Sequence, residues 1–482
     1  MIEVSLAEVA DVVGGVLHSC SGSEMITGGV EFDSRRVQPG GLFVALPGER
    51  VDGHDFAAAA MAAGAAGVLA GRTVDAAAVL APRVTGHRAA QRTGAYALAA
   101  DTDGTGAAVL AALGALARSV VHTLRQAGLQ VVALTGSSGK TSTKDMVAAL
   151  LTPLGATVAP PGSFNNEIGH PWTALRADRA TRHLVLELSA RGLGQIRTLC
   201  QVAPPSIGVV LNVGSAHLAE FGSREAIATA KGELVEALPA AGLAVLNADD
   251  AAVSAMERRT VARVVRFGRS AAAQIRAVDV VLDDRGCPAF RLLSPAGEAS
   301  VRLAVAGEHQ VSNALAAAAV ALELGATPAG VAVTLSRYRP ASRWRMEVTE
   351  RPDGVTVIND AYNANPESVA AALRTLVVLA GAHRRSWAVL GPLAELGETA
   401  TQAYRDIAAL TARLGVDRLV VVGEQARQLH CTVPGSVLVP DIPAALELLH
   451  GELAAGDVVL IKASRSFGLE RIAADLLSGS SG

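Results

Sequence analysis

The segment Thr135-Gly-Ser-Ser-Gly-Lys-Thr141 has the residue types that bind the phosphates of a nucleotide. It lies between the apolar run Val131-Val-Ala-Leu134 and a helical pattern, which is the setting that a phosphate-binding loop requires. There the backbone N–H groups and the helix N-terminus would hold the phosphates, Lys140 would reach the β and γ oxygens, and Thr141 would bind Mg²⁺. The general pattern has glycine at position 134, where this chain has Leu134. The motif indicates nucleotide binding but does not specify the reaction.

Three more polar residues, Glu187, His217 and Lys231, are candidates for ligand binding. Glu187 interrupts the apolar pattern at 183–188 near its C-terminal end, and ligands of open α/β sheets bind at that edge. His217 follows the strand and turn that begin at Leu211, reaches the same edge and can be a metal ligand. Lys231 lies on a helical pattern. A solvated glutamate, a structural histidine and a solvated lysine are the alternative interpretations.

Lysine is rare in this chain, which has 38 arginines and four lysines, namely Lys140, Lys144, Lys231 and Lys462. This usage is typical of a GC-rich genome, in which arginine replaces lysine on solvated surfaces. The two side chains differ in geometry and in amine chemistry. The remaining lysines are therefore candidates for functions that a guanidinium cannot perform, with chance survival as the alternative for any one of them.

The elements that must position these residues alternate between strands and helices. In a block at 101–336, an Ala/Leu helix precedes strand patterns at 131–134, 184–188, 207–211 and 243–246. The last helix of this block is expected at about 311–324, ended by Gly325. Helical patterns separate the strands, which predicts a central P-loop ATPase-like domain with a mostly parallel sheet.

The C-terminal block, at 337–477, repeats the alternation. Its strands are expected at 356–358, 387–390, 419–422 and 458–461, and its helices near 367–380, 401–414 and 442–453. Asn365 is a suitable N-cap and Pro366 suits the first helical position. The pattern predicts a doubly wound, Rossmann-like domain without its own phosphate loop.

The block at 1–100 is expected to be a small N-terminal α/β domain, which ends in a turn-rich linker at 101–106. Its longest uncharged apolar stretch, at 56–71, is too short for a membrane span and is predicted to be a buried or half-buried helix. The chain is thus predicted to be an α/β protein of three domains, with a Ser-Gly tail at 478–482.

Composition excludes several classes of protein. Half of the residues are hydrophobic, 18% are charged and the net charge is −3, which argues against disorder and against nucleic-acid binding through bulk charge. The acidic N-terminus lacks the basic region of a secretory signal. We therefore expect a cytoplasmic protein, with no nucleic-acid partner and no stable membrane insertion, that acts as a monomer. Its four isolated cysteines are expected to be core thiols in a reducing compartment, at Cys20, Cys200, Cys287 and Cys431.

Together these motifs resemble those of the Mur ligases, ATP-dependent amide-forming enzymes of peptidoglycan synthesis, over nearly the whole chain. Two C-terminal segments, at 359–368 and 390–397, are similar to those of the ligases that add D-alanyl-D-alanine. Asp33-Ser-Arg35 and Asp52-Gly-His-Asp-Phe56 are similar to segments of the family's UDP-sugar domain. The other matching segments are Phe164-Asn-Asn-Glu-Ile-Gly-His-Pro171, Asn212-Val-Gly-Ser-Ala-His217, Phe221-Gly-Ser through Ala230-Lys231-Gly, Leu246-Asn-Ala-Asp-Asp250 and Gly307-Glu-His-Gln-Val-Ser-Asn-Ala314.

The resemblance implies an ADP-forming ligase that joins D-alanyl-D-alanine to UDP-N-acetylmuramoyl-tripeptide through an acyl phosphate. The first domain would bind the UDP-sugar peptide, and the third would close on ATP and bind the dipeptide. Mg²⁺ would be held by Thr141, Glu187 and His217, with Lys231 as a carbamate. The implied catalytic residues are Lys140, Glu187, His217 and Lys231. The implied ATP-binding residues are Thr135, Gly136, Ser137, Ser138, Gly139, Lys140, Thr141, Ser142, Asn313, Arg343 and Asp360. The implied substrate-binding residues are Ser34, Arg35, Asp52, His54, Asn165, Asn166, Tyr362, Asn363 and Asn365.

Other functions remain open at this point. One is another Mur ligase step or a folylpolyglutamate synthase-like ligase, which shares the fold and the acyl-phosphate route. The UDP-sugar-like first block and the segment at 362–366 argue against the folylpolyglutamate synthase. Another is a nucleotide-sensing module without turnover. The joint presence of Glu187, His217 and Lys231 argues against a sensor, which needs only the phosphate loop.

Overall fold

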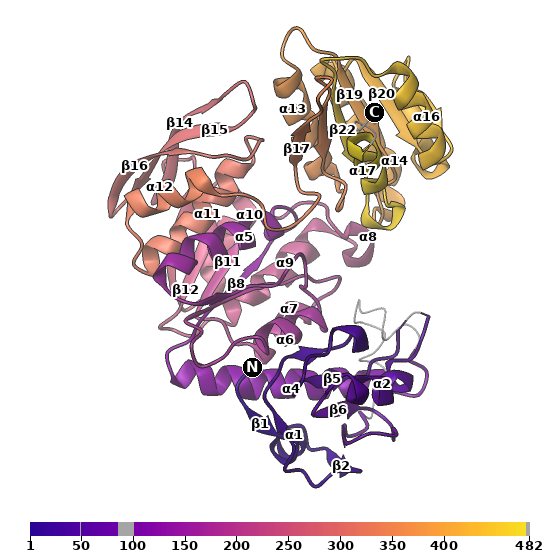
Figure 1. The fold of residues 1–482 in the computed structure, drawn as a ribbon. Coiled ribbons are helices and arrows are strands. Elements are labelled where there is room, and N and C mark those ends of the chain that lie inside the picture. The colour runs from indigo at the N-terminus through magenta and orange to yellow at the C-terminus, as the bar shows by residue number, and fades with distance from the viewer. Residues whose placement is uncertain (49, 85–100, 479–482) are drawn as a thin grey trace.

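Three α/β units follow one another along the chain in the computed structural model, which describes residues 1–48, 50–84 and 101–478. Figure 1 shows the N-terminal unit in indigo at one end, the central unit in magenta and orange, and the C-terminal unit in yellow at the other end. The predicted fold class is confirmed. The expected domain boundary near residue 100 and most of the Ser-Gly tail lie outside the described residues.

The N-terminal unit is built on a five-stranded sheet. Its order is β2-β7-β6-β5-β4, and only β2 is antiparallel to its neighbour. Helices α1 (Leu6–Val13) and α2 (Ala57–Ala62) belong to the same unit, and a capping box between Ser5 and Glu8 starts α1. The strands are β2 (Val16–His18), β4 (Val30–Glu31), β5 (Leu42–Val44), β6 (Gly67–Ala70) and β7 (Ala78–Leu80), and a separate pair joins β1 (Val4–Ser5) to β3 (Met25–Ile26).

The prediction of one helix over 56–71 is wrong. Only α2 is helical, and Gly64 at φ +101° follows it, a conformation that favours glycine. The buried residues of β6 then pair with β5 on one side and β7 on the other. Pairing with distant strands outweighs the helix propensity of the alanines, and this information is absent from the local pattern.

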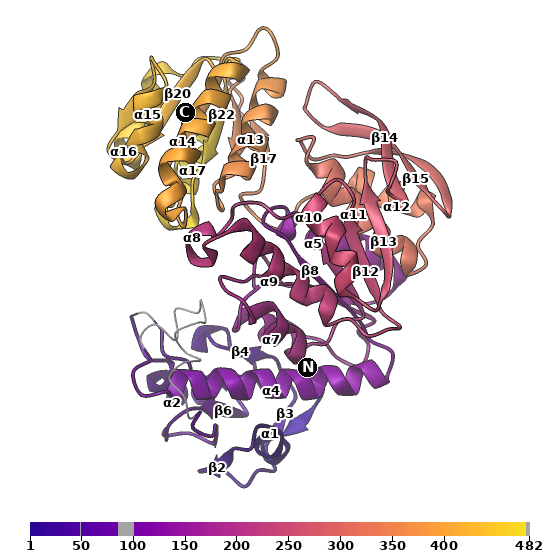
Figure 2. The same cartoon turned by 180° about the vertical axis from the view of Figure 1, so that it is seen from behind.

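A long helix, α4 (Thr105–Gln126), lies between the N-terminal and central units, as Figure 2 shows. Asp101 and Asp103, expected in a linker, instead accept hydrogen bonds from the first N–H groups of this helix. Helix α4 packs against α1 on one side and against α6 (Gly169–Ala174) and α7 (Gln195–Val202) on the other. It is long and apolar enough to cross a membrane, but 56% of its most apolar window is buried, as in the core helix of a soluble protein.

The central unit has a nine-stranded sheet in the order β16-β15-β14-β13-β12-β11-β8-β10-β9. The predicted strands are confirmed as β8 (Gln130–Thr135), β10 (His183–Glu187), β11 (Ile207–Val210) and β12 (Leu243–Asn247), all parallel. Sequence analysis missed β9 (Thr157–Val158), β13 (Arg263–Gly268) and an antiparallel arm of β14 (Ile275–Leu282), β15 (Pro288–Ser294) and β16 (Gly297–Arg302). The arm is half-exposed, so it lacks the continuous apolar runs that mark buried parallel strands.

Two helices of the central unit pack against each other beside the sheet. They are α5 (Lys140–Leu151), which follows β8, and α11 (Gln310–Glu323). The predicted end of α11 is confirmed, with Gly325 at φ +98°. The remaining helices of this unit are α8 (Leu218–Phe221), α9 (Arg224–Glu236), α10 (Ala251–Ser254) and α12 (Pro328–Arg337).

The C-terminal unit has a six-stranded sheet in the order β17-β18-β22-β19-β20-β21. All pairs are parallel except the edge strand β17 (Glu347–Glu350). Asn365 caps α13 and Pro366 is its first residue, as predicted. The other strands are β18 (Thr356–Asn359), β19 (Ser386–Leu390), β20 (Arg418–Val422), β21 (Val437–Val439) and β22 (Val458–Lys462), and the helices are α13 (Pro366–Ala380), α14 (Ala400–Leu414), α15 (Arg427–Thr432), α16 (Ile442–Glu452) and α17 (Glu470–Ser478).

The expectation of four core thiols is wrong for three of the cysteines. Cys200 is buried, Cys20 and Cys287 are partly buried, and Cys431 is exposed. Burial raises the pKa of Cys200 to about 12, and the nearby charge of Glu233 adds to the effect. This thiol is therefore inert at neutral pH.

Candidate active site

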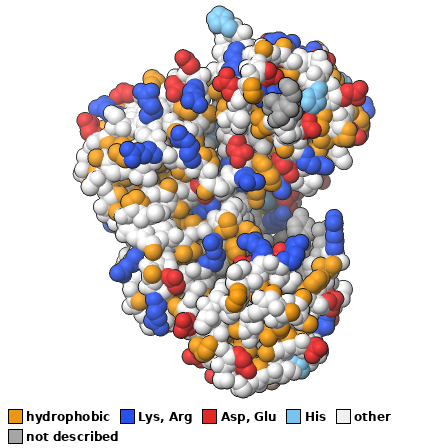
Figure 3. Space-filling model, in the orientation of Figure 1, with side chains coloured by type: hydrophobic (Ala, Val, Ile, Leu, Met, Phe, Trp, Pro, Cys, Tyr) orange, Lys and Arg blue, Asp and Glu red, His pale blue; other side chains and the backbone are white. Residues whose placement is uncertain are grey.

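A cavity of about 880 Å³ lies between the central and C-terminal units. Its walls are the loop between β8 and α5, the ends of β10 and β11, the start of α11, and loops of the C-terminal unit. In the view of Figure 3 the surface is also hollowed below the C-terminal unit, toward the N-terminal unit, and positively charged side chains lie beside this hollow. Ligands of parallel α/β sheets bind at such strand ends.

The predicted phosphate loop is closed on itself by its lysine. Nζ of Lys140 donates a hydrogen bond to the carbonyl of Gly136, 2.8 Å away, and α5 begins at this lysine. Gly139 has φ +78°, and a Cβ there would lie 2.4 Å from Oδ1 of Asn313. The loop therefore requires glycine at position 139 both for its backbone and for the close approach of α11.

Asn212 holds the phosphate loop from the neighbouring strand end. Its Oδ1 accepts hydrogen bonds from the N–H groups of Ser137 and Ser138, at 3.0 and 2.9 Å. Its Nδ2 donates to the carbonyl of Ser138. The segment after β11 thus fixes the loop conformation through one side chain.

Thr141 and Glu187 lie together beneath the loop, as the sequence predicted for two neighbouring ligands. The hydroxyl of Thr141 donates to Oε2 of Glu187, 3.0 Å away, and Glu187 is 1% exposed. Asn165 donates from Nδ2 to the other oxygen of Glu187 at 2.7 Å. The hydroxyl and the carboxylate are hard oxygen donors, the type of ligand that Mg²⁺ prefers, so this pair fits the ion.

Arg345 enters the site from the chain segment that joins the central and C-terminal units. Its Nη2 donates to the hydroxyls of Thr141 and Ser163, at 3.1 and 3.2 Å. Its guanidinium lies 4.0 Å from the ring centroid of Tyr362, while its Nε is buried without a hydrogen-bond partner among the described residues. A partly buried cation whose buried Nε has no partner among the described residues suits an anionic ligand at this position.

Burial lowers the pKa of Lys140, and the charge of Arg345 contributes in the same direction. The carboxylates of Glu187 and Glu395 oppose this shift by stabilising the ammonium. The site therefore places two cationic side chains beside a buried carboxylate. An anion that enters would neutralise them.

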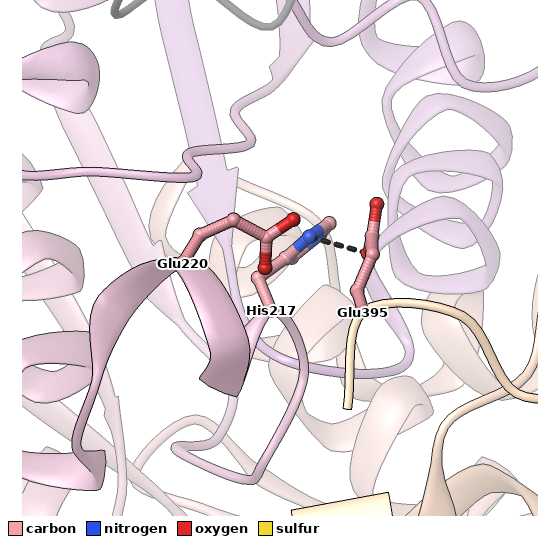
Figure 4. A group of neighbouring side chains, drawn as sticks. All are labelled: His217, Glu220 and Glu395. Atoms are coloured by element: carbon pink, nitrogen blue, oxygen red, sulfur yellow. Dashed lines mark ion pairs between the residues drawn. The ribbon is translucent and has the colours of Figure 1, made fainter. Parts of the chain in front are cut away.

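His217 is paired with the C-terminal unit rather than hydrogen bonded to Glu187 or Thr141. Its Nδ1 lies 2.6 Å from Oε2 of Glu395, and Figure 4 marks this ion pair with a dashed line. Arg191 reaches the other oxygen of Glu395 at 2.9 Å. Glu220 lies on the opposite side of the imidazole, and the ligand atoms of Glu220, His217 and Glu395 are within 4.8 Å of one another. Thr141 and Glu187 are thus in direct contact, whereas the expected third ligand has another partner.

Lys231 is buried on α9, 5% exposed, and does not belong to the residues that line the cavity. Burial lowers its pKa well below the ordinary value, and the charge of Lys140 lowers it further. The amine is consequently neutral in a larger fraction of molecules than that of a solvated lysine.

The C-terminal wall contains a buried cation, Lys462, which is 2% exposed. Nζ of Lys462 lies 2.6 Å from Oδ2 of Asp360 and donates to the carbonyl of Asn363 at 2.8 Å. Asp360, Tyr362, Asn363 and Asn365 all line the cavity, as predicted for residues near the substrates. Asn365 also donates from Nδ2 to the carbonyl of Ser137, 3.4 Å away, which links the cap of α13 to the phosphate loop.

The structure does not bring every predicted residue into the cavity. Arg343 is exposed and does not line the cavity. Arg345 lines it instead. The predicted residues that do line it are Ser137, Ser138, Gly139, Lys140, Thr141, Ser142, Asn165, Asn166, Glu187, His217, Asn313, Asp360, Tyr362, Asn363 and Asn365. Those that do not are Thr135, Gly136, Lys231, Arg343, Ser34, Arg35, Asp52 and His54.

The four N-terminal residues lie in a different unit. Nδ1 of His54 is 2.6 Å from Asp52, and its Nε2 accepts a hydrogen bond from the N–H of Gly71, so both ring nitrogens serve the fold. Arg35 pairs with Asp33 and is largely exposed, which leaves its guanidinium accessible to a ligand.

Sequence analysis missed several residues of the site. Glu395 belongs to the segment at 390–397, and Lys462 is one of the four lysines, so both carried a signal. No feature of the sequence identifies Arg191, Ser163 or Arg345 as site residues. Arginine and serine are common in this chain, and the orientation of these side chains depends on the fold.

Three family models match the chain. They are the Mur ligase middle domain at 134–321, the Mur ligase glutamate ligase domain at 344–465, and the Mur ligase family catalytic domain at 27–120.

The chain is 53% identical to a UDP-N-acetylmuramoyl-tripeptide–D-alanyl-D-alanine ligase of Mycobacterium tuberculosis, over 99% of this chain and 98% of that one. It is 33% identical to the ligase of the same name from Escherichia coli, over 98% of each chain.

Solved structures agree with these matches. MurF from Acinetobacter baumannii superposes with a TM-score of 0.84 at 29% identity, over 99% of each chain. The MurF ligase of Thermotoga maritima in complex with ADP superposes with a TM-score of 0.76 at 28% identity, over 94% of this chain and 98% of that one.

Proposed function

The chain belongs to the Mur ligase family, and from this membership and the cavity we infer that it joins D-alanyl-D-alanine to UDP-N-acetylmuramoyl-tripeptide at the expense of ATP. The reaction belongs to peptidoglycan precursor synthesis. The observation that carries the proposal is the meeting of a phosphate loop, a buried Glu187 and Arg345 in one cavity between two units.

The chemistry follows from the charges. The carboxylate of the tripeptide attacks the γ-phosphorus of ATP, the bond to the bridging oxygen of ADP breaks, and an acyl phosphate forms. The amine of D-alanyl-D-alanine then attacks the acyl carbon, loses a proton and expels phosphate. Two anions must approach each other in the first step, and Lys140 and Arg345, which both line the cavity, offset their repulsion.

Mg²⁺ would add further positive charge between the phosphates and the carboxylate. Thr141 and Glu187 would hold it, because their oxygens are in contact and of the right kind. His217 would join them after release from Glu395. Lys231, as the family resemblance implies, would contribute as a carbamate, and its lowered pKa supports this because a neutral amine is the form that attacks CO₂.

The remaining assignments extend this proposal to the domains. Residues 101–336 bind ATP with the phosphate loop and Asn313, and residues 337–477 close on it with Asp360 and bind the dipeptide near Tyr362, Asn363 and Asn365. Residues 1–100 bind the UDP-sugar peptide through Ser34, Arg35, Asp52 and His54, with Asn165 and Asn166 nearer the reacting end. We propose that the enzyme acts as a monomer in the cytoplasm.

Phosphate release by the purified protein tests the function. ATP, UDP-N-acetylmuramoyl-tripeptide and D-alanyl-D-alanine together should give phosphate and a product with the mass of the amide, and omission of any one should stop the reaction. Lys140→Arg is the inactive control, with a loss of at least about a hundredfold. Turnover only with a single amino acid, or with a folate as acceptor, would assign another ligase step.

A further inference from the structure

Lys144 takes part neither in the phosphate site nor in the carbamate, and unlike Lys140 and Lys462 it does not line the cavity. It lies one helical turn after Thr141 on α5 and is 1% exposed. Its Nζ is 2.6 Å from Oδ1 of Asp145, and it donates to the carbonyl oxygens of Pro160 and Gly162 at 2.6 and 3.1 Å. A buried ammonium so fully surrounded by oxygens holds those oxygens at fixed positions.

The same ion pair holds the segment that joins the central and C-terminal units. Nζ of Lys144 lies 3.4 Å from the hydroxyl of Ser342, and Oδ2 of Asp145 accepts a hydrogen bond from the N–H of Ser342 at 3.1 Å. Four residues later, the N–H of Met346 donates to Asp360 of the C-terminal unit at 3.1 Å. Arg345 thus lies on a short segment that is fixed at both ends.

The carbonyl groups that Lys144 binds belong to the loop between β9 and α6, which also contains Ser163. The hydroxyl of Ser163 lies 2.9 Å from that of Thr141 and accepts a hydrogen bond from Arg345. Lys144 therefore contacts both chain segments that meet at Thr141, the loop with Ser163 and the segment with Arg345, and it contacts them from behind the cavity wall.

We propose that Lys144 and Asp145 are positioning residues, which place Arg345 and Ser163 at Thr141 so that the phosphate site is complete when ATP binds. This inference rests on the proposed ATP site. A lysine is required because its compact ammonium donates hydrogen bonds to carbonyl oxygens in several directions, whereas the planar guanidinium of arginine is wider and directs its donors into one plane. This explains why lysine persists here in a chain that otherwise uses arginine.

The test is a double-mutant cycle on nucleotide affinity. Calorimetry measures the Kd of ATP, in the presence of Mg²⁺, for the wild type, Lys144→Met, Arg345→Ala and the double variant. Positioning predicts that Lys144→Met weakens ATP about tenfold in the wild-type background and less than about twofold once Arg345 is absent. The affinity for UDP-N-acetylmuramoyl-tripeptide should remain unchanged.

One further variant separates an effect on ATP affinity from an effect on stability, and another replaces Lys144→Met if that variant does not fold. Met146→Ala removes a fully buried side chain from the same helix without touching Ser342, and it should lower the melting temperature while leaving the Kd of ATP unchanged. If Lys144→Met does not fold, Asp145→Asn replaces it in the cycle, since it keeps the shape and removes the charge of the pair.

An equal loss of ATP affinity in both backgrounds, or no loss in either, would overturn the positioning role while leaving the ligase proposal intact. A wild-type protein that binds no ATP would overturn the ligase proposal itself. Because the binding measurement needs no acceptor substrate, an error in the assignment of the dipeptide does not affect it.

Discussion

Glu395 of the C-terminal unit lies 2.6 Å, through Oε2, from Nδ1 of His217 of the central unit. Its other carboxylate oxygen, Oε1, forms an ion pair with Arg191, which also belongs to the central unit. Burial raises the pKa of Glu395, but the hydrogen bond to His217 and the charges of His217, Arg191 and Lys140 outweigh it and hold the pKa below its ordinary value. An ionised Glu395 thus joins the two units at the edge of the cavity.

Glu395→Gln should weaken this contact between the two units, because a neutral amide loses the charge that attracts both Arg191 and His217. We expect a larger radius of gyration in small-angle scattering of the ligand-free protein, and recovery of the wild-type value when ATP and the UDP-peptide are added. The control is Glu398→Gln, an exposed residue three positions away. Identical scattering curves for wild type and Glu395→Gln would contradict the prediction.

Arg345 and Arg343 form a matched pair, since they stand two residues apart and only Arg345 lines the cavity. Arg345→Ala should lower turnover by about 10² to 10³, the usual cost of losing a preorganised charge-stabilising donor. Arg343→Ala should stay within about twofold of the wild type, as expected for an exposed side chain. Steady-state kinetics with saturating acceptor and dipeptide measure both, and a reversed order would return the ATP role to Arg343.

Lys231→Arg distinguishes a carbamate from a simple cation. Arginine keeps the positive charge but forms no stable carbamate, so we expect a loss of about a hundredfold or more in rate. Added bicarbonate should stimulate the wild type and not the variant. Intact-protein mass spectrometry of the wild type under CO₂ gives an independent readout, and an active Lys231→Arg enzyme would exclude the carbamate.

His170 makes the stability of the protein depend on pH. Burial lowers its pKa to about 4 from an ordinary value of 6.5, and a contact with the backbone of Leu199 offsets a little of this. Between pH 4 and 6.5 the imidazole of His170 is protonated in the unfolded chain and neutral in the folded protein. Stability is therefore complete above pH 6.5 and falls as the pH drops toward 4, by about 3 kcal/mol in total.

His170→Phe should remove this contribution, because phenylalanine fills the space without titrating. Urea unfolding at several pH values would show a smaller decline for the variant than for the wild type between pH 6.5 and 4. Parallel curves for the two proteins would show that His170 is protonated in the folded state.

The four lysines show how much the sequence alone can predict about this protein. Lys144, Lys231 and Lys462 are 1%, 5% and 2% exposed, and Lys140 closes the phosphate loop. Their rarity predicted special functions, which stays a prediction; the structure shows that three of them are buried and that Lys140 and Lys462 line the cavity. The phosphate loop was predictable for a related reason, since a buried strand, a glycine-rich turn and a helix start are encoded by neighbouring residues.

Sequence determined the fold class, the parallel strands β8, β10, β11 and β12 of the central unit and the phosphate loop, because these follow from local periodicity and from residue types. Only the tertiary structure decided which side chains meet. Whether Arg343 or Arg345 faces the cavity depends on a segment with positive φ at Trp344 and Met346, held by Asp145 on one side and Asp360 on the other. These contacts join residues some 14 to 200 positions apart, so no local pattern around Arg345 contains them.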